Sequence, residues 1–178
     1  MIKQITLAVL TTVLLASTSF AGNNSSFVTE LTQDQKDELL FIYQEEKVAR
    51  DAYITLGNYY PNQTVYQNIQ RSEQEHMDSA QALCEKYGVD ISNVDEAEIG
   101  VFVLPALQEL YDTLIAQGYQ SELSGLMVGE YIELTDIDDL HHAQEGMPTD
   151  VIKVFENLKE GSYNHLDAYR NAIDAYNQ

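Results

Sequence analysis

Apolar residues recur at alternating steps of three and four along four long stretches of the chain, which is the spacing of an amphipathic helix. The four stretches are residues 32–59, a region from about 62 or 64 to 87, residues 121–144 and residues 149–176. Their lengths and periods predict four long helices, each with one apolar stripe.

Residues near the ends of these stretches support the predicted boundaries. Thr32 and Gln35 have the spacing of a capping box at the start of the first helix. Gly88 follows the second helix and Gly146 the third, as expected where a chain leaves a helix through a glycine. Within the fourth, the Gly161-Ser162 pair lowers helix propensity by about 1 kcal/mol for the glycine, which allows a local kink.

The connection after the second stretch is long for a compact domain and requires a reason. Residues 88–104 lack a helical period, and Leu104-Pro105 opens a short helix over 105–118. A bundle whose second and third long helices run parallel needs one connection of about the helix length. At about 3.3 Å per extended residue, the segment 88–104 is long enough to supply it. The chain is therefore predicted to be all-α, a four-helix bundle with one long crossover that carries a short extra helix.

Polar residues interrupt each of the four stripes at mid-length. Glu46 interrupts the first, Glu73 and His76 the second, Glu133 the third and His165 the fourth. In the third stretch two registers fit the pattern. One places Glu130 beside Glu133 on the stripe, and the other places Asp136 there.

Carboxylates that meet in an apolar interior repel one another, and each desolvated ion costs several kcal/mol. Proteins relieve this cost by protonation, by pairing with Lys or Arg, or by binding metal. No Lys or Arg lies on the four stripes. Four carboxylates and two neutral imidazoles would balance two divalent ions, and Glu73 and His76 share one helix face. We therefore expect a metal pair; the alternative is a protonated or hydrated polar layer without metal.

The overall charge supports a cation as the ligand. The 178 residues include 9 Lys and Arg against 29 Asp and Glu, a formal charge of −20. So acidic a surface repels phosphate backbones and anionic lipids, which argues against nucleic acid and membrane-surface binding. The single cysteine, Cys84, excludes an intrachain disulfide, a Cys-rich zinc site and an iron–sulfur cluster.

The first residues have the pattern of a secretory signal peptide. Lys3 precedes an apolar run from Ile5 to Leu15, and Ser19-Phe20-Ala21 fits a cleavage site. We expect a signal peptide over 1–21, a flexible leader over 22–31, the bundle over 32–178, and export to the periplasm or the extracellular space. An uncleaved membrane anchor is less favoured, because the apolar run is shorter than the roughly 20 residues that span a bilayer.

Several longer motifs carry a family resemblance. They are Glu45-Glu46-Lys47-Val48-Ala49-Arg50-Asp51-Ala52-Tyr53, Ser72-Glu73-Gln74-Glu75-His76-Met77-Asp78, Ile132-Glu133 with Asp136-Ile137, and Glu156-Asn157-Leu158, Gly161-Ser162 and Asn164-His165-Leu166. The pattern resembles the ferritin-like di-metal carboxylate superfamily, and most closely its uncharacterised branch, domain of unknown function 2202. The resemblance implies a ferritin-like four-helix bundle. Its implied metal ligands are Glu46, Glu73, His76, Glu133 and His165.

One position departs from the superfamily pattern. Ferritin-like bundles hold two metals with a Glu from each of two helices and a Glu-x-x-His motif from each of the other two. Three residues before His165 this chain has Ser162 instead of Glu. The missing carboxylate must come from Glu130 or Asp136. The resemblance favours Asp136 and the count along the stripe favours Glu130, so both stay open.

Other polar and aromatic residues have simpler interpretations. Tyr169 and Tyr43 each lie one turn from an expected ligand and are candidates for a redox role or a hydrogen bond to a ligand, although buried tyrosines are more often core. His141-His142, with Asp138 and Asp139, is more consistent with a helix C-terminus than with a second metal site. Arg50 and Asp51 are expected to form ion pairs on the surface, and Cys84 to be buried as a small apolar group.

The function expected is that of a di-iron or di-manganese oxidoreductase acting on dioxygen or peroxide, with the ferroxidase and peroxidase chemistry that the resemblance implies. Carboxylate and imidazole ligands favour iron first and manganese second, and zinc or copper are compatible. The alternative is a non-catalytic metal-binding or metal-scavenging bundle, and a hydrolytic two-metal site is a weaker third. The expected partners are metal ions and the small oxidant; a homodimer stays open.

Overall fold

Helices account for all regular secondary structure in residues 30–178, the part of the chain that the computed structural model describes. They are α1 (Gln33–Tyr59), α2 (Thr64–Lys86), α3 (Pro105–Gly118), α4 (Glu122–Ala143) and α5 (Thr149–Tyr176). The predicted all-α class is confirmed for these residues, which contain no strand. None of these helices is long and apolar enough to cross a membrane. The predicted signal peptide lies outside the described residues, as does the leader up to residue 29.

The helix boundaries follow the local signals in the sequence. At the start of α1 the Thr32 backbone N–H donates to Gln35, whose own N–H donates to the Thr32 hydroxyl, so the capping box forms. Gly88 and Gly146 have φ of 65° and 73°, in the left-handed region that favours glycine. The kink allowed at Gly161 does not interrupt α5, which is one continuous helix. Leu31, assigned to the leader, is buried in the core.

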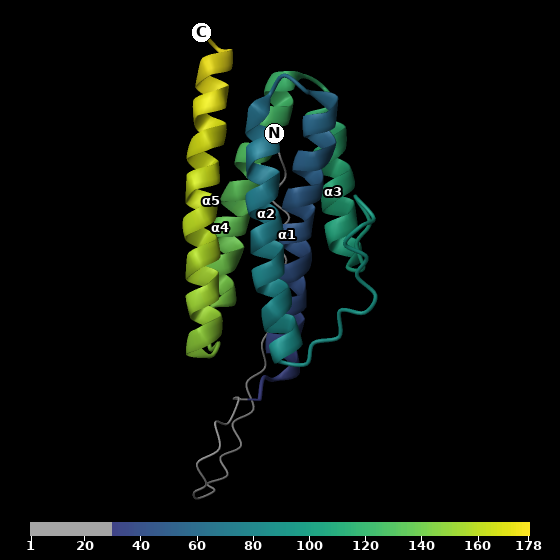
Figure 1. Ribbon diagram of the computed structural model, residues 1–178, viewed down its shortest axis with the longest axis vertical. Helices are drawn as coiled ribbons and strands as arrows, with labels where there is room; N and C mark the ends of the chain where they lie inside the picture. The colour runs from purple at the N-terminus through teal and green to yellow at the C-terminus, as the bar shows by residue number, and fades with distance from the viewer. Residues whose placement is uncertain (1–29) are drawn as a thin grey trace, which may run out of the picture.

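The four long helices lie side by side with alternating directions (Figure 1). In that view α1 and α5 run upward, whereas α2 and α4 run downward. Contacts join α1 to α2, α2 to α5, α5 to α4 and α4 to α1, and α3 packs on the outside against α1 and α4. The second and third long helices are therefore parallel, as the long crossover predicts.

The crossover combines an irregular segment with a helix. In Figure 1, residues 88–104 run upward from the lower end of α2, and α3 continues in that direction to the upper end of α4. The irregular segment alone was expected to be long enough for the whole distance, but helix α3 covers part of it. The segment is fixed to α1, because the Lys47 ammonium donates to the carbonyls of Glu98 and Val101, and the Gln44 amide oxygen accepts from the N–H of Val103.

Two apolar cores fill the interior, one above the other. The lower core includes Leu39 and Ile42 of α1, Met77 and Leu83 of α2, Leu140 of α4, and Val151 and Phe155 of α5. The upper core includes Tyr53 and Leu56 of α1, Tyr66 of α2, Leu126 of α4 and Tyr169 of α5. On every long helix at least one buried polar residue lies between the two cores. The interior is therefore divided at mid-height by one level of polar side chains.

Candidate metal centre

The level between the two cores contains seven buried polar residues, which we call the polar layer. Its members are Glu46 of α1, Glu73 and His76 of α2, Glu133 and Asp136 of α4, and Ser162 and His165 of α5. Each of the four long helices contributes at least one member. The structure therefore brings together all five residues that the resemblance implied as ligands.

Glu73 occupies the centre of this layer, between the two histidines. Its Oε2 lies 3.0 Å from Nδ1 of His76, and its Oε1 lies 2.8 Å from Nδ1 of His165. The two imidazole rings are stacked, with centroids 5.2 Å apart. One atom from each of the three residues falls within 4.8 Å of the others, a spacing suited to ions held between them.

Each histidine also faces a second carboxylate. Nδ1 of His76 lies 3.3 Å from Oε2 of Glu46, and Nδ1 of His165 lies 3.5 Å from Oε2 of Glu133. The other ring nitrogen of His76, Nε2, lies so close to Gly161 that a Cβ there would collide with it. Glycine at position 161 therefore makes room for His76 while Nδ1 faces the acids. The five side chains form a row with Glu73 in the middle and an acid at each end.

Several atoms of the polar layer have no hydrogen-bond partner although they are buried. Oε1 of Glu73 and Nδ1 of His165 are close, yet their geometry is not that of a hydrogen bond, and both are unpaired. Oε1 of Glu46 and Oδ1 of Asp136 are unpaired as well. Buried polar atoms without partners are costly and rare in native proteins. Oxygen and nitrogen donors that converge in this way fit the ligand set of divalent metal ions.

The structure distinguishes the two acids that sequence reasoning left open. Asp136 lies in the polar layer, where its Oδ2 accepts a hydrogen bond from the Ser162 hydroxyl. Glu130 is partly exposed and accepts from Nε of Arg170 at 3.0 Å. The buried register of α4 is thus the one that contains Asp136, and Glu130 does not join the cluster. The carboxylate of Asp136 reaches Ser162, the position at which the superfamily resemblance implies a Glu.

Burial and neighbouring charges shift the protonation of the layer when no metal is bound. Burial, together with the charge of Glu73, raises the pKa of Glu133 to about 8. Burial also raises the pKa of Glu73, but the close imidazoles of His165 and His76 outweigh it and lower that pKa to about 2. Burial lowers the pKa of both histidines, yet their acidic partners raise His76 to about 11 and His165 to about 10. Without metal, the layer therefore holds extra protons at neutral pH.

Asp136 and Glu46 are also held towards their neutral forms. Burial, and then the charges of Glu46 and Glu133, raise the pKa of Asp136 well above its usual value. Burial raises the pKa of Glu46, although His76 opposes the shift. Three of the four carboxylates therefore carry a penalty for ionisation that a bound cation would remove.

One functional contact was not predicted from the sequence. The hydroxyl of Tyr53 donates to Oε1 of Glu133 at 2.6 Å. Tyr53 lies seven residues after Glu46 and therefore on the same face of α1, a spacing that is equally typical of a core residue. Tyr169 packs its ring against Tyr53, with centroids 5.2 Å apart. Tyr43, the other tyrosine candidate, instead donates to Glu96 of the crossover at 2.6 Å and does not bond a ligand.

The remaining polar candidates lie outside the polar layer. His141 and His142 are exposed, and His142 lies 3.6 Å from Asp138 on the surface of α4. Cys84 is buried, as expected, and its thiol donates to the Leu39 carbonyl.

Arg50 and Asp51 differ from expectation, because they form a buried cluster instead of surface ion pairs. Oδ1 of Asp51 accepts from Arg50 at 2.8 Å, and Oδ2 accepts from Lys47 at 2.6 Å. Residues of the crossover contact all three side chains and bury them. The spacing of residues within α1 cannot show these contacts, because they come from another segment of the chain. We call Lys47, Arg50 and Asp51 the clamp.

Comparisons with known proteins identify relatives without an assigned activity. The model of the family described as an uncharacterised protein domain, DUF2202, matches residues 35–178. Uncharacterized protein MJ0754 of Methanocaldococcus jannaschii is 40% identical over 147 residues, which are 82% of this chain and 78% of that protein. The crystal structure of hypothetical protein MJ0754 from Methanococcus jannaschii superposes with a TM-score of 0.80 at 36% identity, covering 87% of this chain and 88% of the other.

Proposed function

The chain belongs to the DUF2202 family of uncharacterised domains, and from that premise we propose that it is an exported, ferritin-like di-metal protein that acts as an oxidoreductase on dioxygen or peroxide. The packing of four long helices around one central polar layer supports a ferritin-like four-helix bundle. The class of metal follows from the donor set, and the class of reaction from the resemblance of the motifs.

The ligands divide naturally between two ions. One ion would be held by Glu46 and His76, and the other by Glu133 and His165. Glu73 lies between the two histidines, with one oxygen towards each, and would help to hold both ions. Asp136 supplies a fourth carboxylate through its unpaired Oδ1. Four carboxylates and two neutral imidazoles balance two divalent cations.

The observation that carries this proposal is the contact between Oε1 of Glu73 and Nδ1 of His165. The atoms lie 2.8 Å apart in the interior without forming a hydrogen bond, and neither has another hydrogen-bond partner. Without metal the two groups are oppositely charged, yet both atoms stay without a hydrogen bond, and a buried donor or acceptor left unpaired costs about 1–3 kcal/mol. An ion that both atoms ligate removes that cost.

The surrounding residues prepare the site for redox chemistry. Iron or manganese, when bound, would supply the electrons that reduce an O–O bond. The Tyr53 hydroxyl fixes the orientation of Glu133, and the Ser162 hydroxyl fixes that of Asp136. The apolar cores above and below exclude bulk water from the layer.

Metal analysis of protein purified without added metal tests the ligand set. We expect about two ions per chain, with iron or manganese predominant, and loss of most of this metal in Glu73→Gln. Glu75→Gln is the matched control, because it makes the same change two residues away at an exposed position of α2. Equal metal content in all three proteins, or none in the wild type, would contradict the proposal.

A second candidate function is supported by the charge of −20, which favours any divalent cation, including zinc or copper. In this alternative the protein binds or scavenges metal without turnover. Aerobic addition of Fe(II) with hydrogen peroxide separates the two functions. Repeated consumption of peroxide by the loaded protein supports the oxidoreductase, whereas tight binding with no turnover supports the scavenger.

A further inference from the structure

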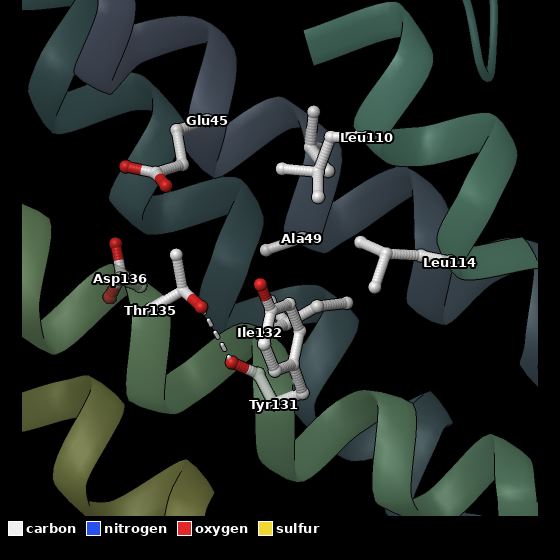
Figure 2. Close-up of a pocket in the computed structure, with 9 residues that line it drawn as sticks. Glu45, Ala49, Leu110, Leu114, Tyr131, Ile132, Thr135 and Asp136 are labelled. Atoms are coloured by element: carbon white, nitrogen blue, oxygen red, sulfur yellow. Dashed lines mark hydrogen bonds between the residues drawn. The ribbon is translucent and has the colours of Figure 1, made fainter. Parts of the chain in front are cut away.

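Helix α3 is fixed along α1 by apolar contacts and a hydrogen bond. Leu110 and Leu114 of α3 and Ala49 of α1 line one small cavity, and Figure 2 shows the two leucines pointing from α3 towards α1. Further along the two helices, the hydroxyl groups of Thr55 and Tyr111 form a hydrogen bond of 2.7 Å. The position of α3 along α1 is therefore fixed, and with it the position of the residues at which the two helices end.

The last turns of α1 and α3 lie against each other. Helix α1 ends at Tyr59 and α3 ends at Gly118. Gly118 is so close to α1 that a Cβ there would lie 2.6 Å from Cδ2 of Leu56. The carbonyl of Gly118 also accepts a hydrogen bond of 2.9 Å from the hydroxyl of Tyr60. These contacts hold Tyr119, the residue after Gly118, beside Tyr59.

Tyr59 and Tyr119 form a pair of exposed aromatic rings in contact. Their ring centroids lie 4.4 Å apart, and the ring planes are inclined by 39°. The two residues are 55% and 41% exposed, so a dissolved oxidant reaches both. Two groups that a fold holds side by side react with each other much faster than groups that must first meet by diffusion. The pair is thus placed for a reaction between its rings.

We propose that Tyr59 and Tyr119 are an oxidative modification site, at which a carbon–carbon bond between the two rings links α1 to the end of α3. The co-reactant is hydrogen peroxide, activated by a one-electron oxidation catalyst. The pair lies on the surface and requires no bound metal, so this inference is independent of the proposed function. With Cys84 as its single cysteine the chain forms no intrachain disulfide, and a tyrosine crosslink is a covalent tie that remains open to it.

The reaction is a balanced two-electron oxidation. Each ring loses one electron to the oxidant, and its phenol group loses one proton to water. The two phenoxyl radicals join through the carbon atoms next to their oxygens, and the hydrogen on each of these carbons then moves to the oxygen and restores the phenol. Hydrogen peroxide takes up the two electrons and two protons, its O–O bond breaks, and two water molecules form. Exposed side chains change rotamer within nanoseconds, so the rings can reach the geometry of the new bond.

Neighbouring tyrosines are less well placed for this reaction. The ring of Tyr60 meets that of Tyr59 edge-on, at 90° and with centroids 4.8 Å apart, and its hydroxyl is held by the Gly118 carbonyl. Tyr163 of α5 is exposed, but within residues 30–178 its ring contacts no other aromatic ring. Tyr163 therefore serves as a control for simple exposure.

Limited oxidation of the full chain in dilute solution tests this inference. Metal-free protein is treated with a haem peroxidase and hydrogen peroxide, and the dityrosine fluorescence of the monomer is measured after linked dimers are removed. We expect a fluorescent monomer that is lighter by two hydrogen atoms, in which tandem mass spectrometry finds Tyr59 joined to Tyr119. Tyr59→Phe and Tyr119→Phe should each abolish the signal. Tyr163→Phe is the matched control and should form the crosslink as the wild type does.

The stability of the linked monomer is a second measurement. The new bond closes a long loop and reduces the entropy of the unfolded chain, so the linked monomer should unfold at a higher urea concentration. Dityrosine formed only between molecules, or joining other residues within the monomer, would overturn the inference. A signal that persists in Tyr59→Phe would overturn it as well. Because the protein carries no metal in this experiment, these results leave the proposed function untouched. Circular dichroism of each variant confirms that the helices are retained.

Discussion

Two clusters of buried charge lie on different faces of the same helix, α1. The clamp, Lys47, Arg50 and Asp51, faces the crossover, whereas Glu46 faces the interior and the polar layer. In the clamp, both oxygens of Asp51 accept hydrogen bonds, Oδ1 from Arg50 and Oδ2 from Lys47 and the N–H of Gly100. In the polar layer, four carboxylates meet two histidines and several atoms stay unpaired.

The contrast indicates that burial alone does not distinguish a structural cluster from a binding site. Both clusters are fully enclosed, so both pay the cost of desolvation. In the clamp, hydrogen bonds among Lys47, Arg50 and Asp51 and to backbone groups of the crossover offset the cost of desolvation. The bonds to the backbone also fix the crossover to α1. The polar layer lacks basic partners other than its histidines among the described residues, and its unpaired donor atoms point to a ligand from outside the chain.

The largest effect is expected from breaking the clamp. Asp51→Asn leaves the charges of Lys47 and Arg50 buried without an acid, so we expect a loss of about 3–5 kcal/mol in the free energy of unfolding, measured by urea denaturation. Glu156→Gln breaks the exposed pair with Lys159 and should leave the free energy of unfolding nearly unchanged, because solvent and salt screen exposed pairs. A loss in Asp51→Asn as small as in that control would show that the clamp is not a stabilising cluster.

The pH dependence of stability should reverse when metal is removed. In metal-free protein the pKa values of His76 and His165, about 11 and 10, exceed the unfolded value near 6.5. The folded state then binds more protons, so stability is greatest below about pH 6.5 and falls as pH rises towards 10. Glu133, with a pKa of about 8, adds a loss of the same sign above about pH 4.5. Each extra bound proton contributes about 1.4 kcal/mol per pH unit.

Glu73 acts in the opposite direction at low pH. Its pKa of about 2 lies below the unfolded value, so the stability that it contributes is present above about pH 4.5 and is lost as pH falls towards 2. If Mn(II) binds, its ligands must be deprotonated, so stability should instead rise as the pH increases. Urea denaturation at several pH values, with chelator and with Mn(II), measures both slopes. Equal slopes would contradict a metal pair in the layer.

The sequence predicted those features that depend on spacing within one helix. The capping box at Thr32, the helix stop at Gly88 and the pair Glu73 and His76 are examples, because neighbours three or four residues apart share a face. The clamp could not be predicted in this way. Arg50 is polar and lies beside acids along α1, and its burial is caused by crossover residues about 46 positions later, such as Glu96.

The choice between Glu130 and Asp136 depended on packing between helices for a similar reason. Both acids lie one turn from Glu133, so helical spacing favours neither strongly. Gly129 decides the register, because its missing side chain lets the Tyr169 ring of α5 lie against α4 where a Cβ would collide. That close approach turns the face with Asp136 inward. The sequence shows Gly129, but it does not show that the ring of Tyr169 packs against it.

Removing Asp136 should have an intermediate effect, and on metal affinity more than on folding. Asp136→Asn removes the charge of a proposed ligand while keeping the size of the side chain, so we expect metal affinity to fall by about 10–100-fold. Metal-free stability should change by less than about 1 kcal/mol, because the aspartate is already held towards its neutral form. Isothermal titration with Mn(II) measures the affinity. A similar loss in Glu130→Gln would contradict the register assigned to α4.

The smallest effect is expected from Tyr53→Phe, which removes one hydroxyl from the polar layer without removing a ligand. The Tyr53 hydroxyl donates to Glu133, so its loss should cost about 1 kcal/mol of unfolding free energy and leave Glu133 less well oriented for metal. Tyr66→Phe is the matched control, because Tyr66 packs in the same aromatic cluster but its buried hydroxyl has no partner. We expect that control to be neutral or slightly stabilising in urea denaturation and to bind Mn(II) with unchanged affinity. Equal effects in the two variants would mean that the contact with Glu133 contributes only packing, and that the polar layer fixes its carboxylates without help from the upper core.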